Sequence, residues 1–278
     1  MDRPFPPLDG VEHRFAQAGD VRLHYAEAGD PDGEPLVLLH GWPQHWYMWR
    51  GVIERLAPQF RLIAPDLRGF GWTEAPGDGY DAETFANDQV ALLDALEIES
   101  ASVIGHDWGG WTAFLVALAA PERVSALRAF SITHPWAPAA PRPQDAFYLA
   151  YQPLMALPIL GPALQRFTNA VDLAFVGDIH DEDDRRIYTD SFKEADRAEA
   201  ASRVYRTFLT SEVFADDPEE RLTVPTKLVV GDGDPVLHEG RLQGFEEHAD
   251  DMTLEIMAGT HWLPEEHPQL VADRIAGD

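Results

Sequence analysis

The stretch Gly105-His106-Asp107-Trp108-Gly109-Gly110 decides how this chain of 278 residues can fold. An apolar run at residues 101–104 precedes it and a helix-forming run at residues 111–118 follows it, so the pattern predicts a buried strand, a sharp turn and a helix. Glycines two positions before and two positions after Asp107 suit a turn in which strand and helix lie too close for larger side chains. Such a turn pushes its central side chain out above the sheet, in front of the N–H groups that begin the helix. We therefore predict that the carboxylate of Asp107 is presented above the sheet.

A carboxylate in this position has a definite chemistry. It is ionised at neutral pH and can act as a nucleophile without a base. Attack on an ester would give an anhydride that readily reverts, whereas displacement at an sp³ carbon gives an alkyl-aspartyl ester that water can open. Asp107 therefore favours an epoxide or an alkyl halide as the substrate. The structural alternative is that Asp107 caps the helix and that His106 is a packing residue.

Strands alternate with helices along most of the chain, which predicts an α/β core with a mainly parallel sheet. Gly19-Asp20 lies between two alternating segments and predicts an N-terminal hairpin of edge strands at residues 13–18 and 21–26. The further predicted strands are residues 36–39, 61–66, 101–104, 124–132, 226–230 and 252–257. The predicted helices of the core are residues 46–56, 82–96, 111–118 and 269–275.

The alternation stops between residues 136 and 221, where no run typical of a buried strand occurs. This segment opens with several prolines and continues with helical patterns at residues 147–157 and 195–209, as expected of an inserted helical lid. We therefore expect a core made of residues 1–135 and 222–278, with the lid at residues 136–221.

The composition argues against several kinds of partner. The formal net charge is −27, from 48 acidic and 21 basic residues, which argues against binding to nucleic acid or to an anionic membrane surface. There is no cysteine, which excludes disulfides and thiolate metal sites and places no constraint on the compartment. The sequence shows neither a signal peptide nor an apolar run long enough to span a bilayer, so we expect a cytoplasmic protein. The sequence leaves the oligomeric state open, a homodimer included.

An acid and a base are predicted near the turn. His261 follows the last predicted strand, so its imidazole can reach over the sheet edge toward Asp107. Asp234 follows the preceding strand and can orient that imidazole. Asp232 is an alternative, and we expect one of these two aspartates to be only a turn residue. The set Asp107, His261 and Asp234 predicts a nucleophile, a base and an orienting acid.

A second wall of the site is predicted from His40-Gly41-Trp42-Pro43, which follows a buried strand. The backbone N–H of Trp42 can converge with that of Trp108 on an oxyanion. That oxyanion belongs to Asp107 itself when His261 activates a water to hydrolyse the ester. Simple turn packing is the alternative role of Trp42 and its proline.

Four separated motifs together resemble the α/β-hydrolase superfamily, and within it the group of epoxide hydrolases and haloalkane dehalogenases. They are His40-Gly41-Trp42-Pro43, Asp66-Leu67-Arg68-Gly69-Phe70-Gly71, Gly105-His106-Asp107-Trp108-Gly109-Gly110 and Gly259-Thr260-His261-Trp262-Leu263-Pro264-Glu265-Glu266. The resemblance spans nearly the whole chain and implies an α/β-hydrolase fold with an inserted helical cap. It implies hydrolysis of a small apolar organic substrate by water, with no cofactor and no metal ion. In this group the acid follows the strand before the lid or the strand after it. Because Thr133-His134-Pro135 offers no carboxylate, the resemblance supports Asp234.

Epoxide hydrolases and haloalkane dehalogenases differ in the atom that leaves the carbon, which is an epoxide oxygen in one and a halide in the other. Epoxide hydrolases protonate the opening epoxide with two lid tyrosines, which Tyr151 and Tyr205 resemble, with Tyr148 in reserve for the first. Many haloalkane dehalogenases carry an asparagine where this chain has Trp42, whereas Trp108 fits either activity. The resemblance therefore favours an epoxide hydrolase. A haloalkane dehalogenase is the alternative, and a non-catalytic fold that binds a small ligand is the alternative of another class. The residues expected to line an apolar pocket are His40, Pro43, His106, Trp111, Tyr148 and Trp262.

Overall fold

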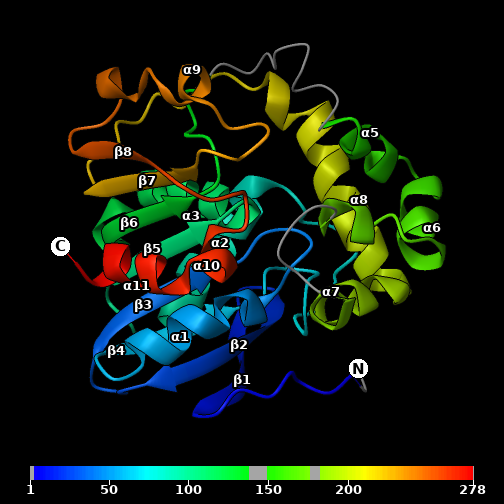
Figure 1. The fold of residues 1–278 in the computed structure, drawn as a ribbon, viewed down its shortest axis with the longest axis horizontal. Coiled ribbons are helices and arrows are strands. Elements are labelled where there is room, and N and C mark those ends of the chain that lie inside the picture. The colour runs from blue at the N-terminus through cyan, green and yellow to red at the C-terminus, as the bar shows by residue number, and fades with distance from the viewer. Residues whose placement is uncertain (1–2, 138–148, 176–181, 278) are drawn as a thin grey trace.

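The computed structural model describes residues 3–137, 149–175 and 182–277 (Figure 1). They contain one eight-stranded sheet in the order β1-β2-β4-β3-β5-β6-β7-β8, in which the strands from β3 to β8 run parallel. The strands are β1 Val11–Ala18, β2 Val21–Gly29, β3 Glu34–Leu39, β4 Phe60–Pro65, β5 Ala101–His106, β6 Val124–Phe130, β7 Thr226–Gly231 and β8 Met252–Met257. The prediction of a mainly parallel α/β sheet is confirmed.

The predicted N-terminal hairpin is present, but only β1 is an edge strand. β2 pairs with β1 on one side and with β4 on the other, antiparallel to both. Its side chains are buried on both faces of the sheet, since Leu23 packs in one hydrophobic cluster and Ala26 in the other. The prediction that both hairpin strands lie at an edge was therefore wrong for β2.

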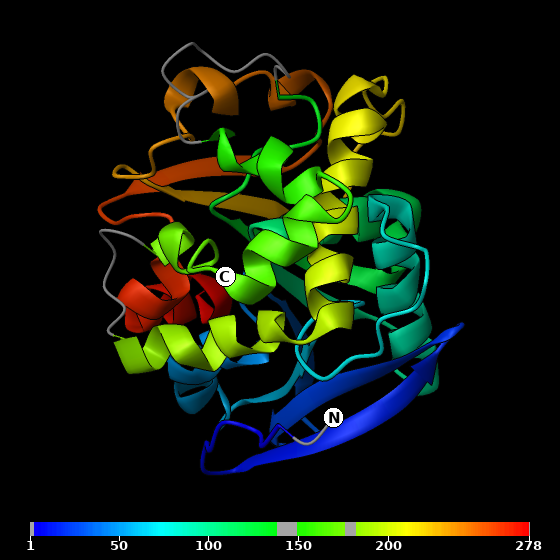
Figure 2. The same cartoon turned by 90° about the vertical axis from the view of Figure 1, so that its right-hand side faces the viewer.

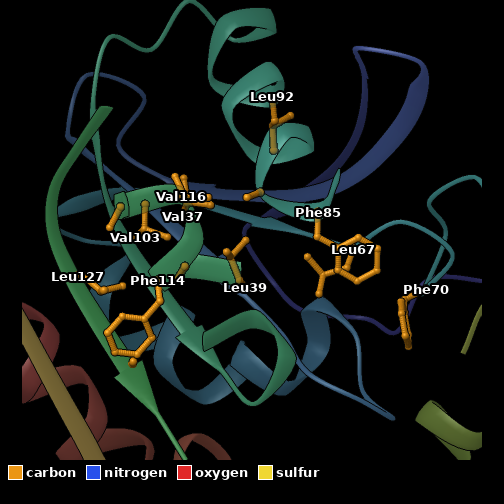
Figure 3. Close-up of a cluster of buried hydrophobic side chains, with 14 of the residues drawn as sticks. Val37, Leu39, Leu67, Phe70, Phe85, Leu92, Val103, Phe114, Val116 and Leu127 are labelled. Atoms are coloured by element: carbon orange, nitrogen blue, oxygen red, sulfur yellow. The ribbon is translucent and has the colours of Figure 1, made fainter. Parts of the chain in front are cut away.

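Helices cover both faces of the sheet. The core helices are α1 Arg50–Leu56, α2 Ala82–Ala95, α3 Trp108–Ala119, α9 Glu239–Leu242, α10 Leu263–Glu266 and α11 Pro268–Ala276, with short 3₁₀ helices at Trp46–Trp49, Pro121–Arg123 and Phe245–Glu247. α1 packs with α11 on one face, and α2 packs with α3 on the other. Leu36 and Leu38 of β3 join the first of these two layers, whereas Val37 and Leu39 join the second (Figure 3). Burial on both faces explains why β3 is a continuous apolar run in the sequence.

A helical insertion lies between β6 and β7, beside the sheet (Figures 1 and 2). Its helices are α5 Tyr151–Ala156, α6 Leu160–Phe167, α7 Glu182–Thr189 and α8 Ala195–Thr210, with 3₁₀ turns at Asp172–Phe175, Asp190–Lys193 and Glu212–Phe214. The insertion lies over the ends of β3 and β5, because Trp42 and Trp108, which follow these strands, both pack against Tyr205 of α8. Between β6 and residue 221, the described part of the chain contains helices and no strand.

One buried arginine anchors the insertion to the core. Arg197 of α8 is 1% exposed, and its guanidinium donates to the backbone carbonyls of Phe70 and Thr73 in the loop after β4. A long charged side chain is rarely buried unless it is hydrogen-bonded, so these bonds set the position of α8. In the described ranges, we find no helix whose length and apolarity would let it cross a bilayer.

Candidate active site

The turn between β5 and α3 holds Asp107 in a strained conformation. Its φ is 53° and its ψ is −125°, and its backbone N–H donates to the Phe130 carbonyl at 3.1 Å. A Cβ on Gly105 would lie 2.2 Å from the carbonyl oxygen of Gly109, and a Cβ on Gly109 would lie 2.3 Å from that of Leu39. Only glycine fits these two positions, as the sequence predicted. Strain of this kind persists where the surrounding structure imposes it, and it typically marks a functional residue.

The loop after β3 binds the Asp107 carboxylate. The backbone N–H of Trp42 donates to Oδ1 of Asp107 at 2.9 Å. A Cβ on Gly41 would lie 2.3 Å from the same oxygen, so this approach also needs glycine. Trp108 begins α3 directly after Asp107, and a role for its N–H as a second donor to an oxyanion stays a prediction.

His261 lies between two carboxylates. Its Nδ1–H donates to Oδ2 of Asp234 at 2.8 Å, and its Nε2 lies 3.7 Å from Oδ2 of Asp107. The other oxygen of Asp234 accepts the backbone N–H groups of Val236 and Leu237 at 2.9 and 3.0 Å. Asp232 accepts instead from the backbone N–H of Gly259, at 3.2 Å. The structure thus brings Asp234, and not Asp232, to the imidazole.

These two carboxylates decide the charge of His261. Burial by itself disfavours the imidazolium, but Asp234 and Asp107 outweigh it and raise the pKa of His261 to about 10. Burial by itself would raise the pKa of Asp234, but His261 and two backbone N–H groups hold this pKa below its usual value. At neutral pH the site therefore rests as a protonated imidazole between two carboxylates. The side chains of Asp107 and His261 are 21% and 26% exposed, so neither is sealed inside the core.

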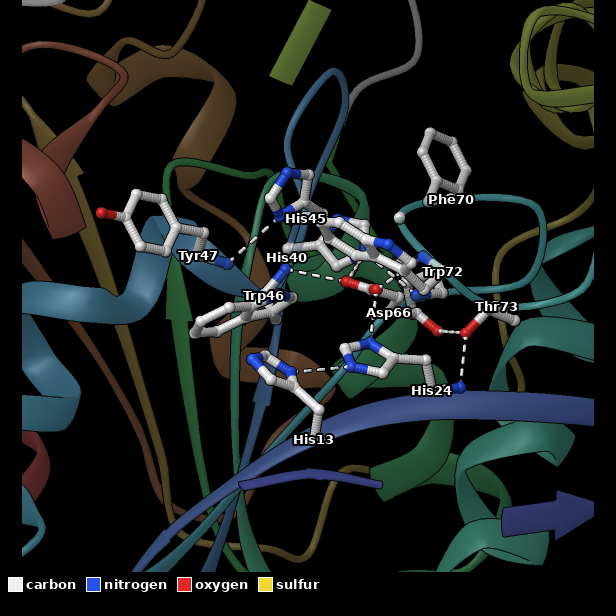
Figure 4. Close-up of polar contacts among 12 residues, drawn as sticks. His13, His24, His40, His45, Trp46, Tyr47, Asp66, Phe70, Trp72 and Thr73 are labelled. Atoms are coloured by element: carbon white, nitrogen blue, oxygen red, sulfur yellow. Dashed lines mark hydrogen bonds and ion pairs between the residues drawn. The ribbon is translucent and has the colours of Figure 1, made fainter. Parts of the chain in front are cut away.

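Buried polar groups around Asp66 connect the loops that follow β3 and β4 (Figure 4). Asp66 accepts the backbone N–H groups of Trp46 and Trp72, each at 2.9 Å, and the Nδ1–H of His24 at 2.7 Å. Burial would raise the pKa of Asp66, but His24 and neighbouring histidines hold it well below its usual value. His40 is fully buried, and its Nε2 accepts the backbone N–H of Leu67 at 2.9 Å. His40 therefore supports the loop from beneath instead of facing the interior of the site.

His106 and Trp262 also lie behind the site. His106 is fully buried, and its Nε2–H donates to the backbone carbonyl of His261 at 2.7 Å. Burial, together with the neighbouring His261, lowers the pKa of His106 to about 4, so the ring is neutral. Trp262 is 7% exposed and packs edge-on against the His261 ring. Pro43, also expected in the pocket wall, is buried in the loop that carries Trp42. All three side chains are buried, and they pack in or against the loops that carry Trp42, Asp107 and His261.

Two tyrosines of the insertion face the site. The hydroxyls of Tyr151 and Tyr205 lie 3.1 Å apart, and the Tyr151 ring stacks on Trp42 with centroids 5.4 Å apart. Burial, and then the charge of Asp107, raise the pKa of Tyr151 to about 12. Burial, with Tyr151 and Asp107, raises the pKa of Tyr205 well above its usual value. Both hydroxyls therefore carry a proton at neutral pH and can donate it.

Of the two remaining residues expected in the pocket, the structure describes Trp111. Trp111 lines, with Trp108, Tyr80 and Val204, a cavity of about 10 Å³ between α2, α3 and α8. That volume holds no more than a water molecule, so this cavity is too small for a substrate. Tyr148 lies outside the described residues.

Sequence reasoning missed two contributors. Phe192 in the 3₁₀ turn after α7 packs against the Trp42 ring, with centroids 6.3 Å apart. Glu265 accepts hydrogen bonds from three distant segments, through Gln44, Arg50 and Tyr188. No local spacing in the sequence signals either contact, since each joins segments that are far apart in the sequence.

Comparison with known proteins decides the family. A model described as the alpha/beta hydrolase fold matches residues 34–268. The chain belongs to the alpha/beta hydrolase fold family. Two curated relatives of this alpha/beta hydrolase are a soluble epoxide hydrolase of Corynebacterium sp. (strain C12), 32% identical and covered to 95% in each chain, and the AB hydrolase superfamily protein YfhM of Bacillus subtilis (strain 168), 32% identical over 96% of this chain and 98% of YfhM.

Two solved structures are similar to this alpha/beta hydrolase over almost the whole chain. The epoxide hydrolase CorEH has a TM-score of 0.83 at 31% identity and covers 96% of this chain and 98% of its own. Cfl2 from Burkholderia cenocepacia has a TM-score of 0.82 at 29% identity and covers 99% of this chain and 98% of its own. The predicted fold, the hydrolase class and the resemblance to epoxide hydrolases are confirmed.

Proposed function

We propose that this hydrolase converts an epoxide to a vicinal diol through a covalent ester on Asp107. The proposal rests on the protonated hydroxyls of Tyr151 and Tyr205. The charge of Asp107 contributes to the raised pKa of both, and both rings pack against Trp42, whose backbone N–H donates to Asp107. Ring opening of an epoxide requires a nucleophile and a proton donor close to one another, and these residues supply both. The helical insertion, expected at residues 136–221, acts in this proposal as the cap that supplies the donors.

The first step is displacement at carbon. One carboxylate oxygen of Asp107 attacks an epoxide carbon, the C–O bond breaks, and the oxygen that leaves takes a proton from Tyr151 or Tyr205. The second step needs a base. Once Asp107 is an ester its negative charge is gone, so one of the two influences that raise the pKa of His261 is lost. Formation of the ester itself therefore brings His261 closer to its neutral, basic form. In that form it has lost its resting proton to solvent, and it regains a proton from solvent when Asp107 ionises again.

Water then opens the ester. His261, oriented by Asp234, takes one proton from a water whose oxygen attacks the carboxyl carbon of Asp107. The Trp42 N–H, already 2.9 Å from Oδ1, stabilises the oxyanion that forms. The bond between the carboxyl carbon and the ester oxygen breaks, and His261 gives its proton to that oxygen, which leaves with the diol. The second proton of the water is released when Asp107 ionises again, and it restores the tyrosine.

Hydrolysis of a haloalkane is the second candidate, because Trp108 stands beside the nucleophile and an indole N–H can bind a leaving halide. The tyrosine pair has no task in that reaction, which is why we favour the epoxide.

Isotope labelling tests the proposal. A single turnover of an aryl epoxide in H₂¹⁸O, with enzyme in excess, should place ¹⁸O in the Asp107 carboxyl group and leave the diol unlabelled. Peptide mass spectrometry locates the label. An ¹⁸O-labelled diol with unlabelled Asp107 would show that water attacks the substrate directly. Release of bromide from 1-bromobutane, with no diol from the epoxide, would favour the haloalkane candidate.

A further inference from the structure

Glu265 is a buried carboxylate that joins separate parts of the molecule. Its side chain is 1% exposed, and Oε1 accepts the hydroxyl of Tyr188 at 2.7 Å and Nη1 of Arg50. Its other oxygen accepts the side-chain amide of Gln44. These partners come from the loop after β3, from α1 and from α7 of the insertion. We name Gln44, Arg50, Tyr188 and Glu265 the Glu265 cluster.

We propose that Glu265 is a positioning residue, and that the Glu265 cluster holds the helical insertion and two loops of the active site in the arrangement that binds and turns over substrate. The inference deepens the proposed function and rests on it for its kinetic consequences. Its structural consequence, the fixing of α7 and of the loop that carries His261, stands independently of the substrate.

The cluster connects the two loops that meet at Asp107. Gln44 follows Trp42 by two residues, and its backbone N–H closes the turn on the Gly41 carbonyl at 3.0 Å. Glu265 follows His261 by four residues, and its N–H bonds the Trp262 carbonyl at 3.0 Å. A bond between the two side chains therefore fixes the Trp42 loop relative to the His261 loop. The spacing of these loops sets how the oxyanion donor and the base lie around the nucleophile.

The same carboxylate holds the insertion. Tyr188 is fully buried, and its hydroxyl also accepts Nη1 of Arg50 at 3.0 Å. Beside it, Nε2–H of His45 donates to the backbone carbonyl of Ile187 at 3.1 Å. Phe192 follows four residues after Tyr188 and packs on Trp42, so a shift of α7 would move a wall of the site.

Because the Tyr188–Glu265 bond is buried, water cannot replace either partner when the bond breaks. If α7 moved away, the hydroxyl of Tyr188 and the carboxylate of Glu265 would each lose a partner inside the protein. Buried polar groups without partners are costly, and a buried charge is more costly still. The cluster therefore favours one docked position of α7 over a range of loosely docked ones.

Two substitutions separate the roles. Tyr188→Phe keeps the ring but removes the bonds of its hydroxyl to Glu265 and Arg50, so α7 loosens while Gln44 stays bound. We expect KM for the epoxide to rise about tenfold, with kcat within about threefold of wild type. Glu265→Gln weakens each bond that Glu265 makes, including the one to Gln44, so kcat should also fall, by about tenfold. Tyr25→Phe, in the core strand β2, is the matched control and should leave both constants unchanged.

Hydrogen–deuterium exchange gives a readout that does not depend on turnover. Amides of residues 182–189 should exchange faster in Tyr188→Phe, and those of residues 260–266 as well in Glu265→Gln, but neither in Tyr25→Phe. Unchanged exchange and unchanged KM in Tyr188→Phe would overturn the inference even if Glu265→Gln failed to fold. A wild type that forms no diol, combined with the expected exchange changes, would refute the proposed function and leave the positioning role supported.

Discussion

Replacing either insertion tyrosine with phenylalanine should slow epoxide opening strongly. The substitutions Tyr151→Phe and Tyr205→Phe keep the rings, including the stack of Tyr151 on Trp42, and remove one hydroxyl each. Because the pKa of Tyr151 is about 12 and that of Tyr205 is also raised, both hydroxyls are protonated donors in the wild type.

The size of the effect follows from what the hydroxyl does. A hydrogen bond to a charge that develops in the transition state is worth about 2–4 kcal/mol. Each variant should therefore lose about 30- to 1,000-fold in kcat/KM, mainly through kcat. The two hydroxyls lie 3.1 Å apart and bond each other, so we expect them to act on one oxygen as a unit. The double variant should lose less than the product of the two single losses.

Steady-state diol formation from an aryl epoxide measures these losses, and halide release from 1-bromobutane is the comparison reaction. If both single variants stay within about threefold of wild type toward the epoxide, the tyrosines are not the proton donors and the argument from their geometry fails. Losses of equal size toward an epoxide and a bromoalkane would show that the hydroxyls only support the fold.

Three further outcomes are expected. Asp234→Asn should slow ester hydrolysis at least tenfold more than Asp232→Asn, because only Asp234 bonds the imidazole; stopped-flow kinetics of the two variants checks this, and the reverse order would transfer the acid role. His106→Leu should lower kcat about tenfold by freeing the His261 backbone, whereas His106→Gln should retain most activity because its amide can replace the Nε2–H donor; equal losses would point to packing alone. The pKa of His261 is about 6.5 in the unfolded chain and about 10 in the folded protein. The charge of His261 therefore stabilises the fold fully below pH 6.5, and this stabilisation is lost as the pH rises through 10. Urea unfolding should show the advantage of wild type over His261→Gln shrinking by about 2 kcal/mol across that range, less than the full shift implies because the side chain is 26% exposed; a constant difference would contradict the raised pKa.

The fold was predictable because its signals are local. Glycines at fixed places around Asp107 mark the strand-turn-helix, and β3 is apolar throughout because both of its faces are buried. The position of β2 was not predictable in the same way. A hairpin signal says that β1 and β2 pair with each other, but it does not say which strand covers the other side of β2.

The meeting of Asp107, Asp234 and His261 was also within reach of the sequence. Each follows a parallel strand, and the carboxyl ends of parallel strands meet at one edge of a sheet. The direction in which a single side chain points could not be predicted from the sequence. His106 was expected to line the pocket, yet it points behind the turn to the backbone of His261. Glu265 could not be singled out, because its partners lie about 80 to 220 residues away in sequence.

The covalent ester on Asp107 is the central claim, and intact-protein mass spectrometry of His261→Gln tests it most directly. This variant keeps the nucleophile and the tyrosines but lacks the base for the second step. After incubation with an aryl epoxide it should gain the mass of one substrate molecule, and peptide mapping should place that mass on Asp107, while Asp107→Ala gains none. A His261→Gln protein that binds the epoxide yet gains no mass, or that continues to release diol at the wild-type rate, would contradict the mechanism.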